Sequence, residues 1–383
     1  MQWLIIALAI AIGWVLGFFS KRRTSSQVAI NKTALEERMQ LLYSSYSSES
    51  LESLVSNLPV SKDTLALHIS IAGHFRKKGE VDRSLLIHQN LLAYPGLPEK
   101  SIEDITYELA KDYMSAGLFD RAEALLLKLQ TSRHFATKAL RKLLDIYTQE
   151  QEWFKAVEVA QKLVQFKEPM SGELTHFYCE LASDSLRSGD LFEAEQFYRR
   201  ALDCDKKAVR PYIAYADFLI KRGSHKEAVS YLRKAAEQNS DFLCELIPRF
   251  LVCAEALKEE TRFRRYLDEL QVDSSPSLAL GMAESLRQEL GAEEAEKYLS
   301  RALLERPKLI TLDRLLDLRM DLAEANTDVA FLAAVKQVTT GLLKEAPRYR
   351  CMGCGFAGKQ LYWLCPSCKQ WGKIRPVQGV SGL

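Results

Sequence analysis

The stretch YELAKDYMSAGLFDRAEALLLKL, residues 107–129, predicts two short helices joined by a turn. Apolar and small residues recur with helical spacing on both sides of Gly117, at Leu109, Ala110 and Tyr113 before it and at Ala122, Leu125, Leu126 and Leu129 after it. A glycine between two such stripes is typical of a turn between helices. Because neither helix can bury its apolar stripe alone, units of this kind must stack on one another.

The same pattern returns at a nearly constant distance along the chain. Its small residue stands at Ala122, Ala156, Ala194 and Ala228, with spacings of 34, 38 and 34 residues. Four other stretches repeat the pattern, residues 71–91, 143–163, 181–201 and 215–235, with Gly79, Gln151, Gly189 and Gly223 at the turns. A period of about 34 residues is the tetratricopeptide period. We therefore predict an all-α solenoid of helical hairpins, the repeat array, over residues 62–346.

The two ends of this array are less regular. Weaker matches cover residues 253–267 and 283–303, and a final pair of helices is predicted over 309–322 and 329–343. In residues 21–61, which include a serine-rich run, we predict a juxtamembrane helical segment or a degenerate first repeat. The concave face of such an array usually binds a peptide or protein, but the spacing assigns no contact residue.

Composition and motifs favour a binding protein over an enzyme. The 383 residues are 47% apolar and 27% charged, which excludes a disordered chain, and the net charge of +2 gives no general reason to expect nucleic acid. The sequence contains no phosphate-binding glycine loop, His-Glu-x-x-His motif or Gly-x-Ser-x-Gly motif. Cys179 follows His176 by three residues, but a nucleophilic thiol also needs accessible, electropositive surroundings.

Residues 1–20 predict a membrane anchor. Trp3 to Phe19 is free of charge and is followed by Lys21, Arg22 and Arg23. As a helix this run would be about 26 Å long, close to the thickness of a bilayer core. A cleaved signal peptide would carry its charges before the apolar run, so we favour a single uncleaved span, and the cations place the rest of the chain in the cytoplasm.

One face of the predicted anchor consists of small residues, because Ala9, Gly13 and Gly17 recur every four positions. Such a face lets another helix approach closely, so it is a candidate packing face for a membrane partner or a second copy. The alternative is that glycine and alanine are simply common in membrane helices.

Residues 347–383 contain two Cys-x-x-Cys motifs, with ligand candidates Cys351, Cys354, Cys365 and Cys368. Four thiolates at this spacing predict one tetrahedral metal ion, either zinc or iron in the manner of rubredoxin. The metal would then be a structural staple for a segment with few large apolar groups. An iron-dependent redox function is the rival interpretation. We also expect Trp363 and Trp371 to pack this segment against the last repeat.

The same segment carries six cations and no acid, at Arg348, Arg350, Lys359, Lys369, Lys373 and Arg375. A tetrathiolate site with a divalent ion has a formal charge of −2, so these cations have a local role and do not require nucleic acid. A nucleic-acid-binding ribbon remains a third hypothesis, which requires binding that weakens steeply with salt.

Taken together, the chain resembles the lipopolysaccharide assembly protein B family of Gram-negative bacteria over essentially its whole length. The resemblance is carried by residues 75–89, by DYMSAGLFDRAE at 112–123, by HFYCELA at 176–182, and above all by residues 347–383, a rubredoxin-like tail. The sequence departs from the family pattern in the serine-rich stretch after the anchor and in the glycine-poor unit at 243–267.

The resemblance implies a function that composition and spacing do not reveal. Members are inner-membrane proteins facing the cytoplasm that assist the membrane AAA protease FtsH in degrading the deacetylase committed to lipid A synthesis. The implied partners are FtsH, that deacetylase and other inner-membrane lipopolysaccharide proteins, and a homodimer stays open. The family's metal ligands correspond to Cys351, Cys354, Cys365 and Cys368. A scaffold that assembles lipopolysaccharide synthesis and export proteins is the alternative.

Overall fold

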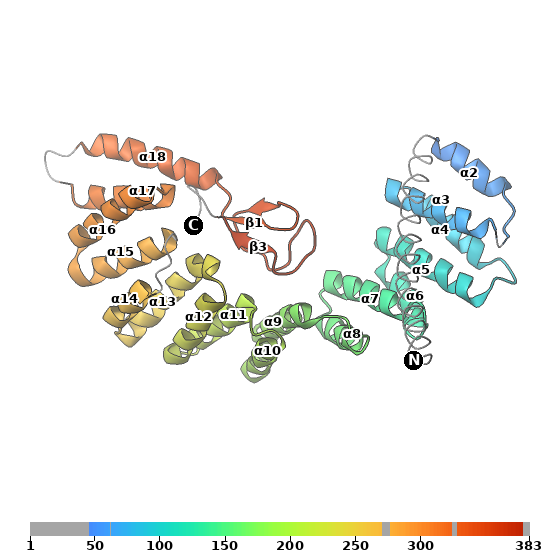
Figure 1. Cartoon of the computed structure of the whole chain (residues 1–383), viewed down its shortest axis with the longest axis horizontal. Helices are drawn as coiled ribbons and strands as arrows, with labels where there is room; N and C mark the ends of the chain where they lie inside the picture. The colour runs from blue at the N-terminus through green and yellow to red at the C-terminus, as the bar shows by residue number, and fades with distance from the viewer. Residues whose placement is uncertain (1–45, 62, 270–275, 324–327, 378–383) are drawn as a thin grey trace, which may run out of the picture. The chain divides into compact units, whose positions relative to one another are not determined.

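The computed structural model describes residues 46–61, 63–269, 276–323 and 328–377. Helices make up most of this chain, with one small sheet near its carboxyl end (Figure 1). The contacts divide the chain into two units between Glu150 and Gln151. Unit 1 contains the helices α2 (Ser48–Asn57), α3 (Leu65–Lys78), α4 (Val81–Leu92), α5 (Glu99–Ser115), α6 (Phe119–Leu129) and α7 (Ala136–Glu150).

Unit 2 contains the remaining helices and the sheet. Its first helices are α8 (Trp153–Gln165), α9 (Ser171–Ser188), α10 (Leu191–Cys204), α11 (Val209–Lys221), α12 (His225–Gln238) and the 3₁₀ turn η1 (Ser240–Phe242). They are followed by α13 (Leu243–Leu257), α14 (Glu260–Glu269), α15 (Pro276–Leu290), α16 (Ala292–Glu305), α17 (Leu309–Asp321) and α18 (Val329–Glu345). The strands are β1 (Tyr349–Cys351), β2 (Ala357–Gly358) and β3 (Ile374–Pro376).

Within each unit, consecutive helices pack as hairpins. In unit 1, α3 packs against α4 and α5 against α6; in unit 2, the pairs include α9 with α10, α11 with α12, and α15 with α16. The predicted final pair is also present, as α17 and α18. The predicted all-α solenoid of helical hairpins is therefore confirmed for the described residues.

The repeated small residue of the pattern marks the closest approach between helices. Ser84, Ala122, Ala156, Ala194 and Ala228 are each 0% exposed, although they come from five different hairpin patterns. A larger side chain at these positions would force neighbouring helices apart, because helix interiors are packed without free volume. This burial explains why the period could be read from the sequence.

The turn position of the pattern needs a left-handed backbone. Gly189 has φ of +88° and its N–H bonds the carbonyl of Leu186 at the end of α9. At the corresponding position of the pattern, Gln151 has φ of +61°. Glycine takes this conformation without strain, whereas glutamine does so at some cost. The turn predicted at Gln151 is therefore present even without a glycine.

Unit 1 is held together by a buried ionic cluster. The carboxylate of Asp112, on α5, is fully buried and accepts hydrogen bonds from Arg76 at 2.6 Å, from the Ser84 hydroxyl at 2.7 Å and from Nδ1 of His88 at 2.5 Å. Arg76 also pairs with Glu108 at 2.6 Å. Because three donors surround Asp112, its burial does not leave an unpaired charge between α3, α4 and α5.

No helix in the described part of the chain is long and apolar enough to cross a membrane. The predicted anchor, residues 1–20, and its face of Ala9, Gly13 and Gly17 lie outside the described residues. They stay predictions. Of the predicted segment 21–61, the structure describes the part from residue 46, where α2 packs against α3.

Candidate metal centre

Two equivalent turns carry the four clustered cysteines. In the first turn, the N–H of Cys351 bonds the carbonyl of Phe356 at 2.7 Å and the N–H of Gly355 bonds the carbonyl of Cys351 at 3.0 Å. The second turn repeats these bonds fourteen residues later, from Cys365 to Gln370 at 3.0 Å and from Lys369 to Cys365 at 2.9 Å. The residue four after the first cysteine has positive φ in both turns, +78° at Gly355 and +55° at Lys369.

A three-stranded antiparallel sheet holds the first turn in place, in the order β2-β1-β3. Tyr349 lies opposite Gly358 on one side and Pro376 on the other, and Cys351 lies opposite Ile374. The second turn is closed by a single bridge between Leu364 and Trp371. We call residues 349–376 the metal module.

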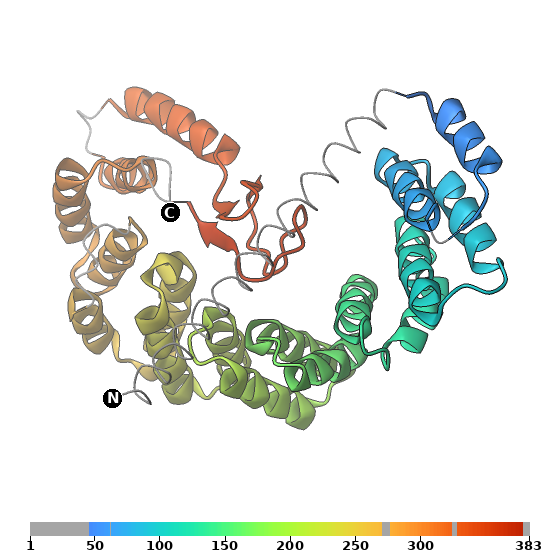
Figure 2. The ribbon, with the colours of Figure 1, turned by 45° about the vertical axis from the view of Figure 1, so that its right-hand side comes forward.

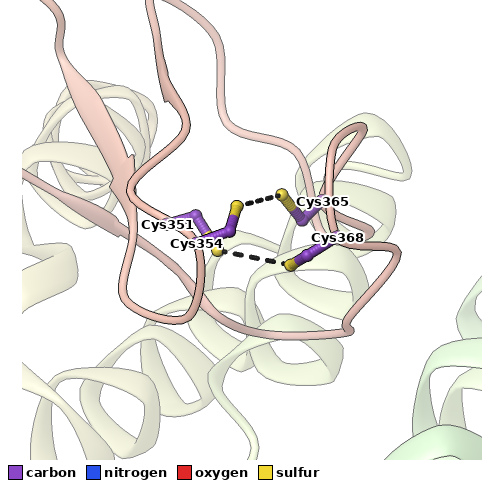
Figure 3. A group of neighbouring side chains, drawn as sticks. All are labelled: Cys351, Cys354, Cys365 and Cys368. Carbon is purple, nitrogen blue, oxygen red and sulfur yellow. Dashed lines mark hydrogen bonds between the residues drawn. The ribbon is translucent and has the colours of Figure 1, made fainter. Parts of the chain in front are cut away.

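The two turns bring the four cysteine sulfurs together, as Figure 3 shows. All four lie within 4.8 Å of one another, and the pairs Cys351–Cys368 and Cys354–Cys365 are each 3.7 Å apart. Four sulfurs about 2.3 Å from one zinc ion would be separated by about 3.8 Å, whereas a disulfide needs about 2.05 Å. The cluster thus fits one metal ion bound by four cysteines, and iron would fit the same donors.

Backbone amides prepare two of these sulfurs for a metal. A hydrogen bond from the N–H of Phe356 is the main cause that lowers the pKa of Cys354 to about 6. The N–H of Cys354 in turn contributes most to lowering the pKa of Cys351. At Cys368 the N–H of Gln370 acts in the same direction, but burial and the neighbouring thiols outweigh it and raise the pKa to about 12. A cation would therefore displace the last protons as it binds.

Two tryptophans of the metal module rest on the helices of unit 2. The Trp371 ring stacks on His176 of α9, with centroids 4.7 Å apart and planes at 17°. It also meets the rings of Trp153 at 6.2 Å and Phe177 at 5.9 Å. Trp363 stacks on Phe242 of η1, with centroids 5.6 Å apart and planes at 20°. Figures 1 and 2 show the sheet on the inner side of the curve formed by the unit 2 helices.

Arg210, on α11, lies under both tryptophans. Its guanidinium carbon is 5.5 Å from the Trp371 centroid and 5.8 Å from that of Trp363, and it pairs with Glu180 at 2.8 Å. Its Nη1 lies 3.1 Å from Nδ1 of His176. Because a guanidinium can only donate, Nδ1 must accept, and the imidazole is neutral with its proton on Nε2.

Further contacts fix the edges of the metal module. The Tyr349 hydroxyl donates a hydrogen bond to the carboxylate of Glu245 on α13, and burial raises the pKa of Tyr349, so that the hydroxyl keeps its proton. Gly372 has φ of +62°, and a Cβ there would stand 3.3 Å from Nε2 of His176. The metal module is thus packed closely against α9, α11, η1 and α13.

Comparison with known proteins agrees with this geometry. A family model described as a rubredoxin metal binding domain matches residues 349–376. The lipopolysaccharide assembly protein B of Escherichia coli strain K12 is 30% identical over 99% of this chain and 98% of its own length. The chain belongs to the lipopolysaccharide assembly protein B family. The Haemophilus influenzae family member of that name is 29% identical, over 98% of this chain and 97% of its own.

Solved structures of other repeat proteins are more distant from this family member. A tetratricopeptide repeat protein from Parabacteroides merdae is 14% identical, with a TM-score of 0.35, and covers 73% of this chain and 99% of its own. The MamA protein is 20% identical, with a TM-score of 0.35, over 48% of this chain and 95% of its own.

The expectation that Trp363 and Trp371 pack against the last repeat is wrong. The structure places them on α8, α9, α11 and η1, and not on α17 or α18. Sequence adjacency suggested the last helices, but the flat aromatic rings of Trp153, Phe177 and Phe242 offer the better-matched surface. The sequence analysis also missed His176 and Arg210 as contact residues.

Cys179 is not an accessible nucleophile. The side chain is buried, and burial raises the pKa of its thiol to about 11, so it stays protonated at neutral pH. Its neighbour His176 has its role in the packing of Trp371 instead.

Acidification is expected to destabilise the docked metal module through His176. Burial, and secondly the charge of Arg210, lower its pKa to about 3, whereas an exposed imidazole has about 6.5. Between these values only the unfolded state takes up the proton, so the free energy of unfolding falls as the pH falls. The expected loss from pH 7 to pH 5 is about 2 kcal/mol.

Urea unfolding at several pH values measures this effect, followed by tryptophan fluorescence because Trp153, Trp363 and Trp371 lie at the interface. The variant His176→Asn should be less stable at pH 7 but should lose less on acidification. Protonation of the cysteines and of Glu180 affects both proteins and cancels in the comparison. Parallel pH dependences would contradict the role given to His176.

Proposed function

We propose that this protein is an inner-membrane adaptor that promotes degradation of the deacetylase committed to lipid A synthesis by the membrane protease FtsH. Its relatives are named lipopolysaccharide assembly protein B, which supports a role in lipopolysaccharide regulation or assembly. The proposed site of action is the cytoplasmic face of the inner membrane, with the predicted single span at residues 1–20 as the anchor.

The docked metal module is the observation that carries this proposal. Trp371 and Trp363 join it to α9 and η1, so that the module and the helices of unit 2 form one continuous surface. The metal would hold the two cysteine turns in the shape that this docking needs. A surface of this kind is suited to binding a client, and the residues described here include no catalytic constellation around it.

Tethering explains how such an adaptor would work without high affinity. An anchored array shares the membrane surface with an anchored protease, which raises the effective concentration of a bound client near that protease. The small-residue face at Ala9, Gly13 and Gly17 would dock the protease, another membrane protein of the lipopolysaccharide pathway or a second copy. We propose no enzymatic activity and no nucleic-acid partner.

The printed name of the relatives favours one second candidate, a scaffold that assembles lipopolysaccharide synthesis and export proteins at the same membrane face. The two functions differ in what happens to the deacetylase. An adaptor shortens its lifetime, whereas a scaffold leaves its lifetime unchanged and alters which proteins are found together.

Depletion of this protein in cells is expected to lengthen the half-life of the lipid A deacetylase several-fold. The reason is that the client would lose its route to the protease while its synthesis continues. A translation block followed by immunoblotting measures the decay. Restoring the full-length chain should restore rapid decay. An unchanged half-life after depletion would reject the adaptor and favour the scaffold.

A further inference from the structure

A pocket of about 290 Å³ lies between α12, α13 and α14, away from the metal module. These three helices follow one another in unit 2 (Figure 1). The pocket is lined by Phe250 and Phe263, both buried, whose rings stack with centroids 5.6 Å apart. Ala254 and Leu257 add to its apolar lining. The pocket therefore has an apolar wall that no described side chain fills.

Arg233 lines the same pocket without a carboxylate partner. Its guanidinium lies over the Tyr266 ring at 4.4 Å, and its Nε is buried with no hydrogen-bond acceptor within reach among the described residues. The other partly buried arginines of the helices are paired: Arg76 with Asp112, Arg210 with Glu180, and Arg249 with Asp217. Because a buried donor without a partner costs free energy, Arg233 lacks an acceptor that its position calls for.

The lining is positively charged overall. Lys226, Arg233 and Arg262 stand against one acid, Glu259, which pairs with Arg262 at 3.2 Å. Lys226 and Arg233 are left to meet an anion. A ligand with a negative group would satisfy both, while the phenylalanine wall would exclude a ligand that is charged throughout.

We propose that this pocket binds a small amphiphilic anion, with a phosphate or carboxylate head on Arg233 and an apolar tail on Phe250 and Phe263. Its volume lies near the lower end of the range of about 300 to 1,000 Å³ found for small-molecule pockets, so the tail is short. This inference does not depend on the adaptor function. The pocket could bind its ligand whether or not the deacetylase is a client.

Calorimetric titration of the full-length chain with hexyl phosphate tests the proposal. The protein is held in lipid nanodiscs, and heat from empty nanodiscs is subtracted. Hexyl phosphate should bind in a one-to-one ratio, whereas hexanol and inorganic phosphate, which each lack one half of the ligand, should bind at least tenfold more weakly. Equal binding of hexanol, or no binding of hexyl phosphate, would overturn the proposal.

Variants locate the binding. Arg233→Met keeps most of the side-chain volume and removes the charge, so the affinity for hexyl phosphate should fall about tenfold or more. The matched control Arg301→Met changes an exposed arginine on α16 and should bind like the parent chain. If Arg233→Met fails to fold, the double rim variant Lys226→Gln and Arg262→Gln decides, with a several-fold loss expected. Unchanged affinity in the variant that folds would place the ligand elsewhere.

Discussion

Replacing Cys351 and Cys354 by serine is expected to release the metal ion and to unfold the metal module. Four-cysteine sites of this size fold only with their metal, whose binding contributes about 10 to 16 kcal/mol in small zinc peptides. Loss of the module would expose the aromatic surface around His176 and Phe242. Under the adaptor proposal, rapid decay of the deacetylase would then stop.

Elemental analysis of the purified chain and the deacetylase half-life measure the two parts of this prediction. Cys204→Ser is the matched control, because Cys204 lies on α10 outside the cluster, and it should change neither the metal content nor the decay. A metal-free variant that still supports rapid decay would separate the metal module from the function. A colourless parent protein with stoichiometric zinc would reject the redox alternative.

Trp371→Ala is expected to detach the metal module while leaving the metal in place. The ring makes contacts with Trp153, His176 and Phe177 and contributes none of the four sulfurs. Removing a buried tryptophan typically costs about 3 to 5 kcal/mol. That cost falls on the docking, so the metal module should become free of the helices without losing its own fold.

Hydrogen exchange together with metal analysis tests this separation. Protection should fall in α9 and around η1, while the metal content stays at the parent level. Tyr362→Ala is the control, because this aromatic residue of the same module is exposed and its ring contacts Phe356 rather than the helices. Unchanged protection in Trp371→Ala would show that the remaining contacts, such as Tyr349 with Glu245, suffice for docking.

Local features of this chain could be predicted from the sequence because each depends on a short spacing. Ala122 and Ala194 are buried as their period required, and Gly189 takes the positive φ that its turn needs. The turn after each cysteine pair is of the same kind. The four cysteines cluster because two tight turns need only be held side by side.

The docking of the metal module could not be predicted, because it joins residues far apart in the sequence. His176 and Arg210 sit within ordinary helical patterns, and nothing in their spacing points to Trp371. A hint was present in the module itself. Its two tryptophans are more apolar surface than so short a segment can bury against its own core, so a second surface had to receive them.

The order in which a ribosome makes this chain gives the docking one more consequence. His176, Arg210 and Phe242 are synthesised well before Trp363 and Trp371, so their aromatic surface stays uncovered until the last residues emerge and acquire their metal. A chain that ends early, or matures without metal, would carry that apolar surface in the open. Cellular quality control could therefore distinguish finished molecules from unfinished ones by this surface.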